Sequence, residues 1–179
     1  MKIQTRLFCL LAVFTSVFSD GCGGMKLEMF ENSTPKFTLE EYFAGKTRAW
    51  GLVHNRSDKL VRQFVVDIQG DWKDGELVLT ENFNYSDGAK DQRIWHIKKL
   101  DEHHYEGRAA DVVGVAKGVQ YGQALNWSYD LNLKVDNSTY RVHFNDWMYL
   151  QPDNVLANRA LFSKFGVNLG EVMLFFRKE

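Results

Sequence analysis

From Thr47 to the C-terminus, apolar and polar residues alternate with a period of two, in runs that turn residues interrupt. Such alternation is typical of β-strands with one buried face. The predicted strands span residues 48–54, 60–70, 76–85, 91–99, 105–115, 123–135, 139–150, 155–162 and 167–177. Nearly every connection is hairpin-sized, the loosest being residues 118–122, whereas parallel strands need long crossovers. The pattern therefore predicts an antiparallel sheet whose roughly nine strands curl into an all-β, up-and-down barrel.

A short helix is expected just before the first strand, over residues 37–43. Thr38 can cap it, Glu41 follows three residues later as in a capping box, and Gly45 can end it. The sequence contains no internal repeat and no linker long enough to divide the chain. Residues 37–179 are therefore predicted to form a single β-barrel domain with a short N-terminal helix.

Turn chemistry fixes the pairing of the strands around Ser86-Asp87-Gly88. As a three-residue loop with Gly88 in the left-handed conformation, this turn places Glu81 beside Arg93 on an otherwise apolar face. Pairing centred on Asp101 then sets Trp95 across from Gly107, where the indole can cover the glycine. The same register brings Asp111 onto the diagonal of Arg93.

A second charged pair is expected in the C-terminal half of the chain. A two-residue turn at Asp136-Asn137 places Trp127 opposite Asp146, and a turn at Pro152-Asp153 pairs Asp146 with Arg159. These charges lie on a face that otherwise carries Leu, Phe and Met. Burying a charge without a partner costs several kcal/mol, so charges at inward positions are informative.

Two interpretations of this inward polar cluster remain open. The charges can be salt bridges that fix the register of a scaffold protein with a filled core. Alternatively, they form the polar floor of a cavity that binds the headgroup of a lipid or another small hydrophobic ligand. The candidate site residues are Glu81, Arg93, Asp111, Asp146, Arg159, Trp95 and Trp127.

A third hypothesis is a lipid-modifying enzyme that uses Glu81 or Asp146. Arginine partners are expected to hold both carboxylates ionised, which disfavours acid–base catalysis. The chain has no nucleophile elbow, Walker loop or dinucleotide fingerprint, and its histidines lack the spacing of metal ligands. No cofactor and no metal are expected, and the formal net charge of −1 gives no footprint for nucleic acid.

The N-terminus resembles an export signal. Lys2 and Arg6 precede an apolar stretch over residues 7–18 that is too short for a comfortable membrane span. A signal peptide over residues 1–21 and a polar tether over residues 22–36 are therefore predicted. Cleavage leaves Cys22 as the single cysteine, which fits lipidation as a membrane anchor; ordinary cleavage after Gly21 is the alternative.

Seven motifs recur in the order found in a known family. They are FAGKTRAWG at 43–51, LTENFNYSDG at 79–88, RIW at 93–95, ADVVGVAKG at 110–118, GQALNWSY at 122–129, NDWM at 145–148 and NRALFSKFGVNLG at 158–170. Through them the chain resembles the uncharacterised proteobacterial lipoproteins of family DUF3833.

The resemblance implies an exported lipoprotein with a lipocalin-like barrel. If Cys22 is acylated, Gly23 after it lacks the aspartate that retains lipoproteins at the inner membrane, so the periplasmic face of the bacterial outer membrane is expected; otherwise the protein lies in the soluble periplasm. The resemblance also points to lipid, because such proteins are encoded near fatty-acid-modifying enzymes. In lipocalins a tryptophan of the first strand and a late arginine close the base of the barrel, which makes Trp50 and Arg177 the candidates for that role. The combined expectation is an exported lipoprotein that binds a lipid or another small hydrophobic molecule in a β-barrel.

Overall fold

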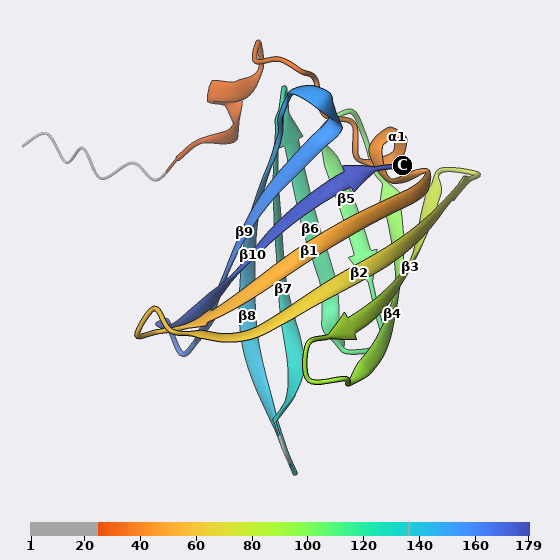
Figure 1. Cartoon of the computed structure of the whole chain (residues 1–179). Coiled ribbons are helices and arrows are strands. Elements are labelled where there is room, and N and C mark those ends of the chain that lie inside the picture. The colour runs from red at the N-terminus through yellow and green to blue at the C-terminus, as the bar shows by residue number, and fades with distance from the viewer. Residues whose placement is uncertain (1–24, 136) are drawn as a thin grey trace, which may run out of the picture.

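The chain folds into ten antiparallel strands that close into one barrel (Figure 1). The computed structural model describes residues 25–135 and 137–179. The strands are β1 (Gly45–Asn55), β2 (Leu60–Lys73), β3 (Glu76–Tyr85), β4 (Lys90–Lys99), β5 (His104–Arg108), β6 (Val112–Tyr121), β7 (Ala124–Val135), β8 (Ser138–Leu150), β9 (Val155–Lys164) and β10 (Val167–Lys178). Each strand pairs with the next along the chain, and β1 pairs with β10. The prediction of an all-β, up-and-down barrel is confirmed, with ten strands where about nine were expected.

The additional strand arises because residues 105–115 do not form one continuous strand. The amide of Val112 donates to the carbonyl of Ala109 at 3.1 Å, and this turn separates β5 from β6. In contrast, Gly118 belongs to β6, although residues 118–122 were predicted to be a loose connection. A Cβ at Gly118 would overlap the indole of Trp127, so this glycine permits close packing and does not mark a turn.

One end of the barrel is closed by helix α1 (Leu39–Phe43). The ring of Phe43 packs edge-on against that of Phe176, with the ring centroids 5.6 Å apart. Lys178 Nζ donates hydrogen bonds to three backbone carbonyls of the helix region, at 2.6–3.0 Å. Thr38 occupies the predicted N-cap position, but its side chain makes no capping hydrogen bond, so the expected capping box is not formed. The helix is held by packing and by Lys178.

The segment before α1 lies against the same closed end. Residues 27–30 form the 3₁₀ helix η1 (Leu27–Phe30), and Phe30 contacts the ring of Tyr149 at 5.6 Å. Ser33 Oγ accepts a hydrogen bond from the amide of Gln123 at 2.9 Å. This described part of the predicted tether is therefore packed onto the barrel. The predicted signal peptide and Cys22 lie outside the described residues.

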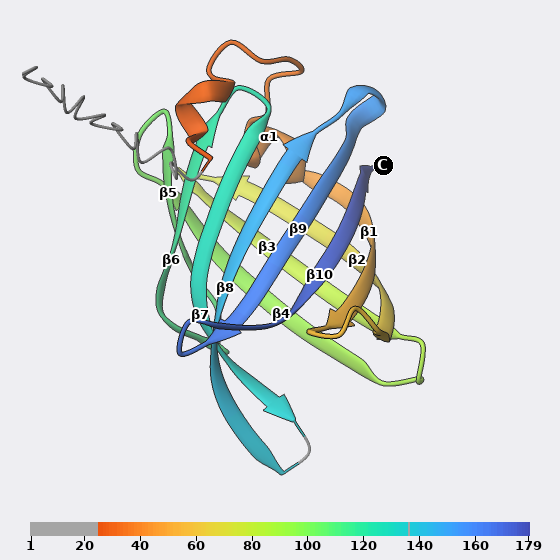
Figure 2. The same ribbon diagram turned by 90° about the vertical axis from the view of Figure 1, so that its left-hand side faces the viewer.

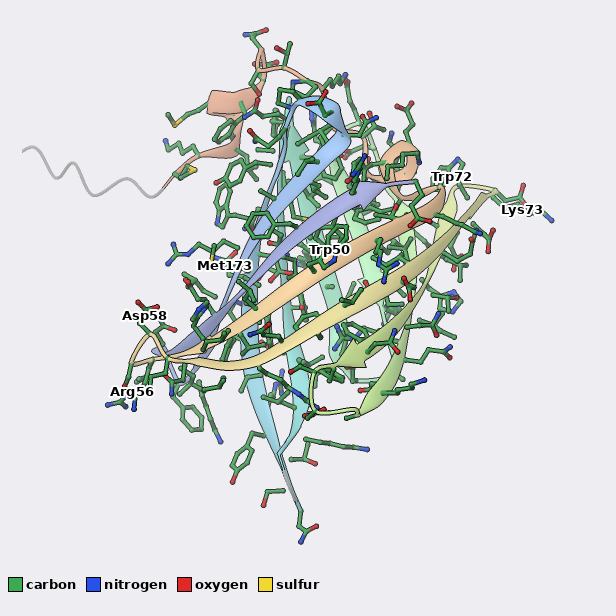
Figure 3. The ribbon with its side chains drawn as sticks, in the orientation of Figure 1. Trp50, Arg56, Asp58, Trp72, Lys73 and Met173 are labelled. Carbon is green, nitrogen blue, oxygen red and sulfur yellow. The ribbon has the colours of Figure 1, made fainter. Side chains whose placement is uncertain are left out.

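The opposite end of the barrel is open and carries the β1–β2, β3–β4, β5–β6, β7–β8 and β9–β10 connections. Figure 2 shows the β7–β8 hairpin projecting from this end. In Figure 3, Arg56 and Asp58 mark the β1–β2 connection at the open end, and Trp72 and Lys73 mark the approach to the β2–β3 connection at the closed end. In the described residues, no helix is both long and apolar enough to cross a membrane.

The lipocalin-type closure by Trp50 and Arg177 is not formed. Trp50 is 44% exposed and lies opposite Phe175 (Figure 3). Arg177 is also exposed and lies opposite Arg48. Both side chains belong to the outward-facing set of their strands, because Ala49 and Phe176 next to them are buried. Helix α1 closes the base instead.

Candidate functional site

The barrel encloses a cavity of about 600 Å³ that extends from α1 to the open end. Leu39 and Phe43 of α1 contribute to its lining at the closed end, and Val61 and Lys134, which are exposed, contribute at the mouth. Its aromatic lining comprises Phe43, Phe64, Phe83, Tyr85, Trp95, Trp127, Tyr129, Phe144, Phe162 and Phe176. The interior is therefore a largely apolar cavity of the size that small-molecule ligands occupy.

Polar side chains interrupt this apolar lining at mid-depth. Glu81 on β3, Arg93 on β4, Tyr129 on β7, Asp146 on β8 and Asn158 on β9 all line the cavity, and we call these five residues the polar belt. Apolar layers flank the belt because inward positions recur every second residue. Leu79, Trp95, Trp127 and Met148 lie on its closed side, and Phe83, Leu131, Phe144 and Phe162 lie on its open side.

The register of β3 and β4 is the one predicted from Ser86-Asp87-Gly88. Glu81 lies opposite Arg93, Leu79 lies opposite Trp95, and Gly88 has a φ of +86°. In the described part of the chain, however, the salt bridge within 4.0 Å to Arg93 comes from Asp111 and not from Glu81. Arg93 Nη2 and Nε both donate to Asp111 Oδ2, at 2.7 and 3.0 Å.

The contact between Arg93 and Asp111 follows from a β4–β5 register that differs from the prediction by two residues. Gly107 lies opposite Ile97, not Trp95. Asp101 Oδ1 accepts hydrogen bonds from the amides of His103 and His104, at 2.8 and 2.9 Å, which lengthens the connection. If this register is continued past the end of β5, Asp111 lies opposite Arg93. Their salt bridge connects the two segments beyond the last residue pair of the β4–β5 ladder.

Arg159 is not part of the cluster, and its predicted pairing with Asp146 is wrong. Asp146 lies opposite Ala160, whereas Arg159 lies opposite Trp147. The β8–β9 connection contains the 3₁₀ turn η2 (Pro152–Asn154), and this connection is one residue longer than predicted. A shift of one residue in the pairing moves every side chain of the strand to the other face. The Arg159 side chain is 62% exposed, and its Nε donates to Glu171 Oε2 at 2.8 Å.

Asp146 and Asn158 retain free hydrogen-bonding capacity inside the barrel. Each residue is only 6% exposed. Among the described residues, Asp146 Oδ1 and Asn158 Oδ1 have no hydrogen-bond partner. An unsatisfied buried acceptor costs about 1–3 kcal/mol, so folding alone does not favour this arrangement. The belt therefore presents to the cavity two hydrogen-bond acceptors that receive no donor from the described protein.

Burial dominates the titration of both belt carboxylates. It raises the pKa of Glu81 to about 7, because the lowering effect of Arg93 is smaller and the charge of Asp111 adds to the increase. Burial likewise raises the pKa of Asp146 to about 7, against the lowering effects of Arg93 and Asn158. The expectation that arginine partners hold both carboxylates ionised is therefore wrong. Burial also raises the pKa of Tyr129 well above its ordinary value, and Asp146 contributes to this increase.

Trp95 and Trp127 form an aromatic wall on the closed side of the belt. Their rings pack edge to face with the centroids 5.7 Å apart, and the rings of Trp95 and Tyr129 pack in the same way with the centroids 5.4 Å apart. The indole of Trp127, and not that of Trp95 as predicted, packs most closely on Gly107. The two indoles therefore have little freedom to move, which gives the cavity a preformed wall.

Tyr129 and Asn158 were not identified from the sequence. Tyr129 follows the predicted inward alternation opposite Phe144, but its hydroxyl was not considered among apolar neighbours. Asn158 would have been found if the length of the β8–β9 connection had been known, because it lies opposite Met148 on the inward face. In residues 25–135 and 137–179, no cluster of His, Cys, Asp or Glu has the geometry to hold a metal ion.

Comparisons with known proteins support the fold and the family. The S-type phycobiliprotein lyase CPES from Guillardia theta has a similar structure, with a TM-score of 0.58 and 12% sequence identity over 87% of this chain and 98% of the lyase. At this identity the likeness shows the lipocalin-like barrel alone. No curated protein matches the sequence. The sequence profile described as "Protein of unknown function (DUF3833)" matches residues 16–178, and the chain belongs to this family, as its motifs predicted.

Proposed function

We propose that the protein binds a lipid or another small hydrophobic molecule inside its barrel. The observation that carries this proposal is a cavity of about 600 Å³ whose apolar lining surrounds a belt with unfilled acceptors. Apolar walls with a few convergent polar groups are typical of small-molecule sites. The similar solved barrel is named a phycobiliprotein lyase, which supports a small-molecule role without indicating the ligand.

The cavity disfavours the alternative of a scaffold protein with a filled core. Protein interiors are close-packed, and side chains that face a void lose the dispersion contacts that a packed neighbour would provide. A barrel selected only for stability would fill this space with larger side chains. Ala160, which lines the cavity and is 2% exposed, is one position where a larger residue would do so.

Blocking the cavity tests the proposal. We expect the neutral dye N-phenyl-1-naphthylamine to fluoresce on binding the purified protein, and Ala160→Phe to weaken this binding at least tenfold by occupying the cavity. Ala157→Phe is the matched control, because Ala157 neighbours Asn158 on the outward-facing set of β9. Native mass spectrometry of protein purified from its source should also detect a bound lipid. If a folded protein neither binds the dye nor carries a lipid, the scaffold interpretation is correct.

We further propose that the protein is exported and anchored through an acylated Cys22. The support is the sequence alone: a positively charged start, a short apolar stretch and one cysteine after the expected cleavage point. Cys22→Ser should release the protein from membranes in fractionation, whereas Cys9→Ser, inside the apolar stretch, should not. Membrane association of the Cys22→Ser variant would contradict the anchor.

A lipid-modifying enzyme remains a second candidate because of one observation. Glu81 and Asp146 are two cavity-facing carboxylates whose pKa values are raised to about 7, as suits general acids and bases. If the barrel is an enzyme, incubation with phospholipid vesicles should change the mass of a lipid, and Glu81→Gln should stop that change while dye binding persists. Unchanged lipids with the wild-type protein would rule this candidate out for the lipids tested.

A further inference from the structure

The charges around the belt do not balance in the described structure. Glu81 and Asp146 belong to the belt, Asp111 contacts it, and Arg93 lies among them. Both donors of Arg93 in this contact are directed to Asp111 Oδ2. The cavity-lining bases Arg62, which pairs with Asp87, and Lys134 lie outside the belt, toward the mouth. Arg159 faces outward. No salt bridge within 4.0 Å reaches Glu81 or Asp146 from the described residues, so the belt has an excess of acidic groups.

The aromatic rings around these carboxylates also favour a positively charged group. Trp95 and Tyr129 stand nearly perpendicular, at 84°, and both line the cavity beside the belt. The face of an aromatic ring carries partial negative charge and attracts cations, most strongly when solvent is excluded. The acceptors Asp146 Oδ1 and Asn158 Oδ1, both buried and without a partner in the described chain, lie in the same cavity.

We propose that the polar belt binds a positively charged nitrogen, so that the ligand is an apolar molecule carrying an ammonium group. This inference rests on the proposed function and specifies its ligand class. The ammonium group donates to Asp146 and Asn158 and faces the rings of Trp95 and Tyr129, while the apolar part of the ligand extends toward the mouth. A fatty-acid carboxylate would instead add another negative charge to an acidic site whose arginine is already engaged.

Binding of an ammonium group should depend on pH because the belt carboxylates must be ionised to attract it. The pKa values of Glu81 and Asp146 are both raised to about 7, mainly by burial. The other charged or titratable groups that face them are Arg93, Asp111 and Tyr129. Affinity for the ammonium should therefore increase between pH 6 and pH 8, whereas affinity for an uncharged ligand should not change.

Three ligands with the same chain but different headgroups test the inference. Dodecylamine, dodecanol and dodecanoate compete for the site against N-phenyl-1-naphthylamine at pH 8. We expect dodecylamine to bind at least roughly tenfold more tightly than dodecanol, and dodecanoate to bind most weakly. The inference is overturned if dodecylamine binds no more tightly than dodecanol. If the folded wild-type protein neither binds the dye nor carries a co-purified lipid, the proposed function itself is refuted.

Two substitutions locate the preference at the belt. Asp146→Asn should abolish the advantage of dodecylamine over dodecanol, and Glu81→Gln should reduce this advantage if the first variant does not fold. Asp130→Asn is the matched control, because Asp130 lies on the outer face of β7 and pairs with Arg141 and His143. A preference for dodecylamine that persists in a folded Asp146→Asn or Glu81→Gln variant would contradict the assignment.

Discussion

Two carboxylates of this barrel are equally buried but differ in their partners. Glu40, at the closed end, is 7% exposed, and Asp146, in the belt, is 6% exposed. Glu40 accepts hydrogen bonds from Lys99 Nζ at 2.5 Å and from the hydroxyl of Tyr105 at 2.7 Å. Asp146 Oδ1 has no partner in the described chain. The protein therefore supplies hydrogen-bond partners to Glu40, but leaves one carboxylate oxygen of Asp146 without a partner.

The titration of the two groups differs accordingly. Burial alone would raise the pKa of Glu40, but hydrogen bonds from Lys99 and Tyr105 outweigh it and hold that pKa below its ordinary value. Burial raises the pKa of Asp146 to about 7, and Arg93 and Asn158 compensate only in part. Burial of a charge thus does not by itself distinguish a structural residue from a binding residue. The distinction lies in whether the protein supplies the partners.

Among the substitutions, removal of the satisfied carboxylate should have the largest effect on stability. Glu40→Ala leaves Lys99 and the Tyr105 hydroxyl without their acceptor, and we expect the free energy of unfolding to fall by about 3 kcal/mol. Urea denaturation followed by tryptophan fluorescence measures this loss. The exposed neighbour Glu41 is the control, and Glu41→Ala should change stability by less than about 0.5 kcal/mol. Equal effects of the two variants would mean that the Glu40 contacts contribute little.

The belt carboxylates should make the wild-type protein less stable as the pH rises. Their pKa values are about 7 in the folded state, so between pH 4 and pH 7 the folded chain holds protons that the unfolded chain has lost. Each extra proton lowers the free energy of unfolding by about 1.4 kcal/mol per pH unit. For the two groups together we expect a loss of roughly 5 kcal/mol between pH 5 and pH 8.

Glu40 contributes in the opposite direction. Because its pKa is lowered in the folded state, its stabilisation is present above the unfolded value and is lost as the pH falls through the folded value. Denaturation at pH 5 and pH 8 tests the contribution of the belt. In Asp146→Asn the loss between these pH values should be smaller than in the wild type. If the wild type is more stable at pH 8 than at pH 5, the belt carboxylates are not titrating as described.

The smallest effect is expected for Arg159→Ala. Its exposed ion pair with Glu171 should contribute less than about 0.5 kcal/mol, because solvent screens it. An inward Arg159 paired with Asp146, as predicted from the sequence, would instead cost several kcal/mol when removed. Chemical denaturation at pH 7 distinguishes the two cases. A large loss of stability would favour the inward pairing.

The hairpins show which parts of the site the sequence could predict. In β3–β4, Gly88 has a positive φ within a loop of defined length, so the position of Glu81 opposite Arg93 followed correctly. In β8–β9, Asp153 and Asn154 both have a positive φ, and the sequence Pro152-Asp153 did not reveal the extra residue. Alternation predicts which residues share a face, but a one-residue error in a connection exchanges the two faces.

The fold itself depended less on such details. Short connections and alternation were sufficient to predict a closed antiparallel barrel, since they require no knowledge of any one turn. The cavity was not predictable in the same way, because whether large side chains meet at the centre depends on their directions and on the barrel's width. The partner of Asp111 also depended on the β4–β5 register, which differs from the predicted one by two residues.

The packing of the N-terminal segment determines which way the barrel would face. Phe30 and Ser33 fix this segment to the closed end, and Tyr149 Oη donates to Met25 Sδ at 3.3 Å. Cys22 precedes Met25 by three residues, a span of about 11 Å at most when fully extended. On the proposal that Cys22 carries the lipid, the base of the barrel rests near its own bilayer and the mouth points away from it. A barrel in this orientation would exchange its ligand with the surrounding compartment or with a facing membrane, and not with the bilayer to which it is anchored.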